Sequence, residues 1–232
     1  MALLGTILYK NYDRKSKFKI GGWIKEHLEE TAMAIWIVLY WVVSIKSNLN
    51  IGVRPLLPVY PFTILLVSGQ LTAISSRLKA INSKKMFKTF SLLLVSLLGW
   101  YVVETFSVWP YFLTYFNEIA GGPSGGYRYV VDSNLDWGQD LSRLNNWVRA
   151  NNISHIELDY FGWTDPKYYL GDRFIWMTSS KYKNDRDFVA RNQTDGWLSV
   201  SATFLQGGNY SWLKSFKPVT AIGHSIFVYQ LE

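Results

Sequence analysis

Three long apolar stretches without charged side chains constrain this chain more than any other feature of its sequence. They cover residues 31–45, 55–76 and 89–103, all in the first half of the chain. An uncharged stretch of about 20 residues can cross a bilayer as a helix, which satisfies its backbone polar groups internally. The first stretch is short, but the ammonium group of Lys46 can reach the headgroups from its end. We therefore predict about three transmembrane helices within residues 31–109.

Basic residues flank these stretches unevenly. The loop between the second and third stretches holds five basic residues and no acid, namely Arg77, Lys79, Lys84, Lys85 and Lys88. Residues 1–30 are also basic, whereas the loop after the first stretch holds Lys46 and Arg54 alone. The positive-inside rule therefore places the basic segment 1–30 in the cytoplasm and residues 110–232 outside. The apolar run 2–9 would be the end of an earlier membrane helix or a short interfacial anchor.

The net charge of +7 belongs to the membrane half of the chain. Residues 1–109 hold 13 Lys and Arg but 5 acids, whereas residues 110–232 hold 11 and 12. Because the basic residues flank apolar helices, we expect membrane lipids and no nucleic acid as partners. The chain contains no cysteine, which excludes disulfides, thiolate metal sites and cysteine nucleophiles.

Residues 110–232 carry the patterns of a small α/β domain. A helix is expected over 137–150, where Leu141, Leu144, Trp147 and Val148 share one face. Alternating or β-rich runs predict strands at 127–131, 153–161, 197–204 and 221–231, with a helical turn at 212–216. The fold class expected is therefore membrane α-helical, followed by a small extracytoplasmic α/β domain.

Polar residues cluster just before the predicted helix of this domain. They are Asp132, Asn134, Asp136 and Asp140. Oxygen ligands at positions 1, 3, 5 and 9 of a loop suit Ca²⁺. The pattern departs from an EF-hand, with Gly138 one position late and Arg143 in place of the final glutamate. In the alternative interpretation Asp136 caps the helix, and the other acids favour its positive end. Contacts with a sugar or a partner loop are a third interpretation.

Two charged residues lie at the ends of predicted spans. Arg54 stands at the outer mouth of the second span, where the phosphate of a lipid-linked sugar would lie. A guanidinium group can bind phosphate through two parallel hydrogen bonds. Contact with ordinary headgroups is the alternative. Glu104 lies inside or near the end of the third span, and is either a functional intramembrane acid or an interfacial one.

The run Asn-Ile-Gly-Val-Arg-Pro-Leu-Leu-Pro-Val-Tyr-Pro-Phe at 50–62 resembles a signature of glycosyltransferase family 39, the protein-mannosyltransferase-like membrane enzymes. Further similar segments lie at 115–123, 132–141, 197–207 and 218–229. Pro55 stands where the family usually has histidine. The resemblance implies a polyprenyl-phosphate sugar donor, and a pair of catalytic acids on an early outer loop. No residue of this chain matches those acids, so no catalytic residue is assigned.

The resemblance is therefore to the C-terminal part of such an enzyme. We expect a non-catalytic, accessory membrane subunit that braces a larger complex with partner membrane chains. The alternative is one piece of a split glycosyltransferase that uses a polyprenyl-phosphate sugar, with the catalytic loop on another chain. A carbohydrate- or cation-binding module is a third hypothesis. In each case the isolated chain is expected to transfer no sugar.

Overall fold

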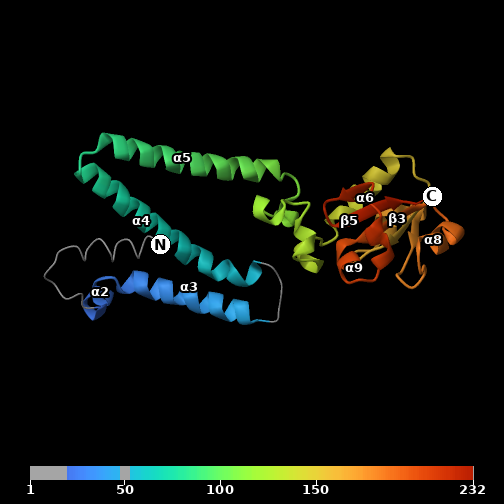
Figure 1. Ribbon diagram of the computed structural model, residues 1–232, viewed down its shortest axis with the longest axis horizontal. Helices are drawn as coiled ribbons and strands as arrows, with labels where there is room; N and C mark the ends of the chain where they lie inside the picture. Colours follow the sequence, from blue (N-terminus) through green and yellow to red (C-terminus); the bar gives the residue numbers. More distant parts are fainter. Residues whose placement is uncertain (1–19, 48–52, 232) are drawn as a thin grey trace. The chain divides into compact units, whose positions relative to one another are not determined.

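A computed structural model describes residues 20–47 and 53–231 of the chain (Figure 1). The chain divides into two compact units, Met1–Val102 and Val103–Glu232. The apolar run at 2–9 and most of the basic segment expected at 1–30 lie outside the described residues. So do residues 50–52, at the start of the signature-like run.

The first unit is helical. Its described elements are α2 (Ile20–Glu26), α3 (Leu28–Lys46), the 3-10 helix η1 (Arg54–Val59), α4 (Tyr60–Ala80) and most of α5 (Lys84–Ser107). Three segments are long and apolar enough to cross a membrane, Leu28–Lys46, Arg54–Ala80 and Lys84–Ser107. This confirms the prediction of about three such helices. The last residues of α5 belong to the second unit.

Three prolines shape the entry to α4. Pro55 and Pro58 fall in the 3-10 helix η1, and Pro61 lies in the first turn of α4. Missing amide donors cost least for Pro55 and Pro61, because the first amides of a helix have no partner within it, whereas Pro58 lies inside η1. The Thr63 hydroxyl donates to the carbonyl of Val59 at 2.8 Å. The chain therefore enters the second span through a tight 3-10 turn that continues into a regular helix.

The long helices leave their apolar side chains uncovered. None of the residues of α3, α4 and α5 is buried. The helices α3 and α4 pack together, and the rings of Trp36 on α3 and Phe62 on α4 lie 6.3 Å apart. Exposed apolar surface of this extent suits lipid tails or the helices of partner chains.

The second unit is built on a five-stranded mixed sheet in the order β2-β1-β3-β5-β4. The strands are β1 (Ile156–Asp159), β2 (Phe174–Trp176), β3 (Trp197–Ser201), β4 (Thr220–Ile222) and β5 (Ile226–Gln230). β1 pairs in parallel with β2 and β3, whereas β5 is antiparallel to both β3 and β4. The unit is therefore an α/β fold, as expected for this part of the chain.

Helices cover both faces of this sheet (Figure 1). They are α6 (Gln139–Ala150), α7 (Pro166–Leu170), α8 (Asp185–Arg191) and α9 (Ala202–Gln206). The described residues of the second unit also form the 3-10 turns η2 (Phe112–Thr114), η3 (Glu118–Ala120), η4 (Gly126–Arg128), η5 (Asp132–Asn134), η6 (Gly171–Arg173) and η7 (Ser211–Ser215). The unit has two hydrophobic cores, and alternate residues of β5 belong to one or the other. Ile226 and Val228 pack with α6, whereas Phe227 and Tyr229 pack with α8, α9 and η7. A strand buried on both faces loses the apolar–polar alternation of a surface strand.

Several local predictions need correction. The run 127–131 is not a strand, because the 3-10 helix η4 occupies Gly126–Arg128. The strand expected over 197–204 stops at Ser201, where α9 begins. The strand expected over 221–231 is a hairpin, because Gly223 and His224 adopt positive φ and reverse the chain. The elements β2, α7 and α8 were not predicted, since each is short and weakly patterned.

Candidate functional site

Arg54 lies at one end of a hollow of about 610 Å³ in the first unit. The hollow is lined by Trp36, Leu39, Tyr40, Val43, Ser44, Ser47, Arg54 and Pro55. This volume falls in the range of small-molecule binding sites. We call it the α3–η1 slot. It contains the one candidate residue that the sequence placed at the outer membrane face.

The wall that α3 contributes is a single helical stripe. Its residues recur at intervals of three and four from Trp36 to Ser47, which spans about 16 Å along a helix. The apolar side chains of Trp36, Leu39 and Val43 occupy the earlier part, and Ser44 and Ser47 the later part, next to η1. The stripe on α3 therefore changes from apolar to polar along its length, and Arg54 and Pro55 of η1 complete the lining of the slot.

Aromatic contacts define the apolar end. The ring of Trp36 lies 5.4 Å from that of Tyr40 and 6.3 Å from that of Phe62 on α4. The sequence does not single out the α3 residues that line the slot, because α3 is apolar on every side. Without a polar face for comparison, one stripe of apolar residues looks like any other. The only signal was the spacing of three and four residues, which any apolar helix contains.

The first two residues of the acidic cluster build a turn. Asp132 has a positive φ of 63°, and its amide donates to the hydroxyl oxygen of Thr203 at 2.9 Å. Its carboxylate accepts from the amide of Ser133 at 2.5 Å. The side-chain amide of Asn134 donates to the carbonyl of Val131 at 3.0 Å. Both side chains thus hold the 3-10 turn η5, and the backbone amide of Asp132 anchors it to α9.

Asp136 does not cap α6 in the way that was expected. The helix begins at Gln139, and its N-cap position is Gly138, with a φ of 107° and no side-chain cap. The Asp136 carboxylate accepts from the amide of Gly138 at 2.7 Å, and the side chain of Gln139 accepts from the amide of Trp137 at 2.7 Å. The extra turn delays the helix by two residues and uses both polar side chains locally.

Asp140 is fully buried in the first turn of α6. Its carboxylate accepts from the Ser225 hydroxyl at 2.5 Å and pairs with the guanidinium group of Arg143. Burial raises the pKa of Asp140, while the bonds from Ser225 and Arg143 act in the opposite direction. The hydroxyl of Tyr160 is buried, and this burial and the nearby Asp136 carboxylate raise the pKa of Tyr160.

The four cluster residues therefore serve separate structural contacts. Across residues 20–47 and 53–231, no group of three or more His, Cys, Asp or Glu side chains is placed to hold a metal ion. Each member of the cluster already contacts a backbone or side-chain group of the protein. Calcium binding by Asp132, Asn134, Asp136 and Asp140 stays a prediction that this geometry does not strengthen.

Glu104 lies one turn before the end of α5. Its carboxylate accepts a hydrogen bond from the Tyr115 hydroxyl at 3.3 Å, and Tyr115 is 43% exposed. A tyrosine that lies outside the helix and shows its ring to the surroundings is typical of the headgroup region. This contact favours the interfacial interpretation of Glu104.

Two buried carboxylates on β1 escaped the sequence analysis. Glu157 is fully buried, accepts from the Tyr182 hydroxyl at 2.7 Å and pairs with Lys181 at 3.1 Å. Asp159 accepts from the Tyr210 hydroxyl at 2.5 Å, and its pKa is raised by burial. Their alternation with apolar residues predicts a strand with a solvated face, whereas both faces of β1 are covered.

Comparison of the chain with known protein families, curated proteins and solved structures finds no match. Its function must therefore be inferred from its own residues.

Proposed function

We propose that the chain is an accessory, non-catalytic membrane subunit of a polyprenyl-phosphate-dependent glycosyl-transfer system, and that its α3–η1 slot binds the lipid phosphate. The observation that carries this proposal is the slot itself. An apolar stripe on α3 leads to Ser44, Ser47 and the Arg54 guanidinium group. That order matches an isoprenoid chain ending in a phosphate.

The chemistry of Arg54 suits this ligand. A guanidinium group presents a planar set of donors that fits two phosphate oxygens at once and stays charged at any physiological pH. Hydrogen bonds to a charged group contribute about 1.5–3 kcal/mol each, more than neutral ones. The hydroxyls of Ser44 and Ser47 add donors on the same side, while the apolar wall accommodates the hydrocarbon. The slot thus offers a complete contact for the lipid and no residue to act on the sugar.

The accessory role rests on two features. The resemblance to family 39 assigns no catalytic acid to this chain, and the three long helices leave apolar faces that partner helices can cover. In this proposal residues 110–232 lie outside, as the distribution of basic residues predicts. The alternative of a split glycosyltransferase shares the same lipid contact. It differs in that a partner chain would carry the catalytic acids.

Lipid binding can be tested with the full chain in phosphatidylcholine nanodiscs. A polyprenyl phosphate should stabilise the chain in native mass spectrometry, and the matching polyprenol should not. Arg54→Gln should weaken binding at least about tenfold, since it removes a charge-assisted contact. Arg77→Gln, in the last turn of α4, is the matched control and should bind as the wild type. Val43→Trp should block the slot without any change in charge.

Two results would refute the proposal: equal binding of polyprenol and polyprenyl phosphate, or unchanged binding in Arg54→Gln. The partner question has its own measurement. Purification of the tagged chain in mild detergent, followed by mass spectrometry, should recover membrane partner chains. A partner that has many spans and an acidic outer loop but no outer α/β domain of its own supports the split enzyme, and a partner transferase that carries both supports the accessory subunit.

A further inference from the structure

The second unit contains a hollow of about 340 Å³ over its larger hydrophobic core. Its lining residues are Tyr127, Arg128, Leu205, Gln206, Leu213, Lys214, Phe216, Pro218, Phe227 and Tyr229. Two of them are cations and none is an acid, although residues 110–232 carry more acids than bases. We call this hollow the η4–η7 cleft, because Arg128 ends η4 and Lys214 lies in η7.

The floor of the cleft is aromatic and rigid. The rings of Tyr127 and Phe227 lie 4.8 Å apart, and Phe227 and Tyr229 project from the same face of β5. Leu213 of η7 is fully buried, and Tyr229 is only 5% exposed. Burial raises the pKa of Tyr229 to about 12, so its hydroxyl stays neutral at physiological pH. Rings held by a sheet offer a ready surface for a ligand with an apolar or ring-shaped body.

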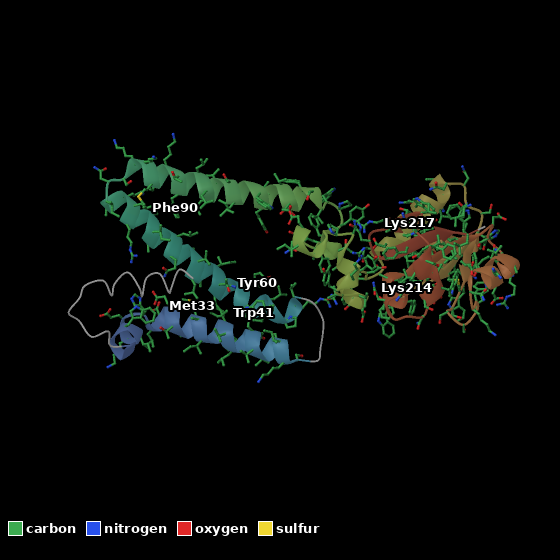
Figure 2. The ribbon with its side chains drawn as sticks, viewed as in Figure 1. Met33, Trp41, Tyr60, Phe90, Lys214 and Lys217 are labelled. Carbon is green, nitrogen blue, oxygen red and sulfur yellow. The ribbon has the colours of Figure 1, made fainter. Side chains whose placement is uncertain are left out.

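The two cations stand at the rim. Both Arg128 and Lys214 are exposed, and the Arg128 guanidinium lies 5.7 Å from the centre of the Tyr127 ring. The attraction between a cation and the face of a ring favours this position of the guanidinium group beside Tyr127. Lys214 lies on the second unit together with Lys217, which immediately precedes the cleft residue Pro218 (Figure 2). A local positive field thus forms at the rim of a unit whose overall charge is slightly negative.

We propose that the η4–η7 cleft binds a phosphate monoester, with the phosphate between Arg128 and Lys214 and the esterified group against Tyr127 and Phe227. A phosphate monoester carries close to two negative charges at pH 7 and three acceptor oxygens, which matches two cations of different geometry. The volume is in the range of a site for one small molecule. Sugar phosphates and the phosphomonoester headgroup of a lipid share this chemistry.

This site is separate from the α3–η1 slot. It consists of residues 127–229 alone, and Arg54 takes no part in it. Failure of lipid binding at Arg54 would leave the cleft proposal intact, and the reverse also holds.

The test uses lysine acetylation of the full chain in phosphatidylcholine nanodiscs, read out by mass spectrometry. A bound phosphate should slow the acetylation of Lys214 and leave Lys167 and Lys183 on the same unit unchanged as internal controls. The soluble probe is glucose 1-phosphate, with glucose and an equal ionic strength of sodium chloride as controls. The lipid probe is a nanodisc that contains phosphatidic acid. In the variant Arg128→Gln, the probe concentration needed to protect Lys214 to the same extent should rise at least about tenfold.

The soluble and the lipid probe distinguish a soluble phosphate ester from a lipid headgroup as the ligand. Protection by glucose 1-phosphate assigns a soluble phosphate ester, and protection in phosphatidic acid discs alone assigns a lipid headgroup. The proposal is overturned if neither probe protects Lys214, if glucose protects it equally, or if Arg128→Gln leaves protection unchanged. Arg128 is exposed, so its substitution is not expected to affect folding, and an unchanged circular dichroism spectrum would establish this.

Discussion

The hydroxyl of Ser225 donates a 2.5 Å hydrogen bond to the carboxylate of Asp140, 85 residues earlier in the chain. Both side chains are buried, at 2% and 0% exposure. The same carboxylate pairs with Arg143, whose guanidinium lies 4.7 Å from the Tyr111 ring and donates to the carbonyl of Pro110 at 3.1 Å. One buried acid therefore joins the start of α6, the β4–β5 turn and the segment that follows α5.

This acid should make stability depend on pH. Burial raises the folded-state pKa of Asp140 above the unfolded value of about 3.9. The folded state then binds the proton more tightly, so its contribution to stability is present at low pH and is lost as pH rises through the window from the unfolded to the folded pKa. In Asp140→Asn that dependence should disappear. The stability of the wild type relative to the variant should fall as pH rises through this window.

Urea unfolding of the full chain in detergent, at a series of pH values from 3.5 upward, checks this. The exposed variant Asp172→Asn is the control, and it should leave the pH profile as in the wild type. A wild-type advantage over Asp140→Asn that grows with pH would contradict the assigned direction of the pKa shift.

Gly223 should be intolerant of a side chain. Its φ is +58°, and an added methyl group would collide with the carboxylate of Asp140. Gly208 also has a positive φ, of +81°, but an added methyl group there meets no atom within 4 Å. Gly208→Ala should therefore cost about 1 kcal/mol of backbone strain, whereas Gly223→Ala should cost about 3 kcal/mol or more.

Introducing Asp140→Ala into both glycine variants separates the cost of backbone strain from the cost of the collision with the carboxylate. With the carboxylate removed, the added cost of Gly223→Ala should fall toward that of Gly208→Ala, as a double-mutant cycle in urea unfolding would measure. An undiminished cost in that background would show that the collision with Asp140 is not the cause.

The buried Glu157 should depend on its tyrosine partner. The Tyr182 hydroxyl donates to this carboxylate at 2.7 Å, and Tyr182 is itself only 3% exposed. Tyr182→Phe keeps the ring but leaves a buried charged acceptor with one donor fewer. We expect a loss of about 1–3 kcal/mol in the free energy of unfolding. Tyr168→Phe changes a ring that is 82% exposed, and should alter that free energy by less than about 0.5 kcal/mol. Equal effects of the two substitutions would exclude a structural role for this hydrogen bond.

The predicted orientation is open to a direct test, because the chain has no cysteine of its own. Single cysteines at Lys84 and Gln193 fall at the first residue of α5, in the basic segment between α4 and α5, and on the surface of the α/β unit. A membrane-impermeant thiol reagent should label Gln193→Cys on intact cells, and should label Lys84→Cys only after the membrane is opened. The reverse labelling pattern would invert the proposed topology.

Much of the secondary structure follows from local patterns. The apolar face of α6, with Leu141, Leu144 and Val148, is buried as its spacing predicts. The strand expected at 153–161 contains β1, although the strand itself is only Ile156–Asp159. The errors arise where a turn depends on backbone conformation. At Gly138 and Gly223 a positive φ shifts the start of a helix or folds a strand back on itself, and a residue pattern does not show it.

The candidate sites were predictable only in part. Arg54 stands out from the sequence because it lies at the predicted outer end of the second predicted span, but the stripe from Trp36 to Ser47 that completes its slot is indistinguishable within an apolar helix. Asp140 was noted as one member of an acidic cluster, whereas its partner Ser225 carries no signal at all. The η4–η7 cleft joins Arg128 to Lys214, which belong to separate turns far apart in sequence.

The sequence by itself determined that this chain has three helices of membrane-spanning length and an α/β unit after them. Both features depend on properties of a continuous segment. One is the free energy of transferring its apolar residues out of water, which sums along the segment, and the other is the spacing of its apolar residues, which differs between helix and strand. The tertiary structure alone buries Glu157 in a core, brings Asp140 to Ser225, and places Arg128 and Lys214 on the lining of one cleft. These pairings depend on strand register and on chain reversals between distant residues, where a shift of one position turns a side chain to the opposite face.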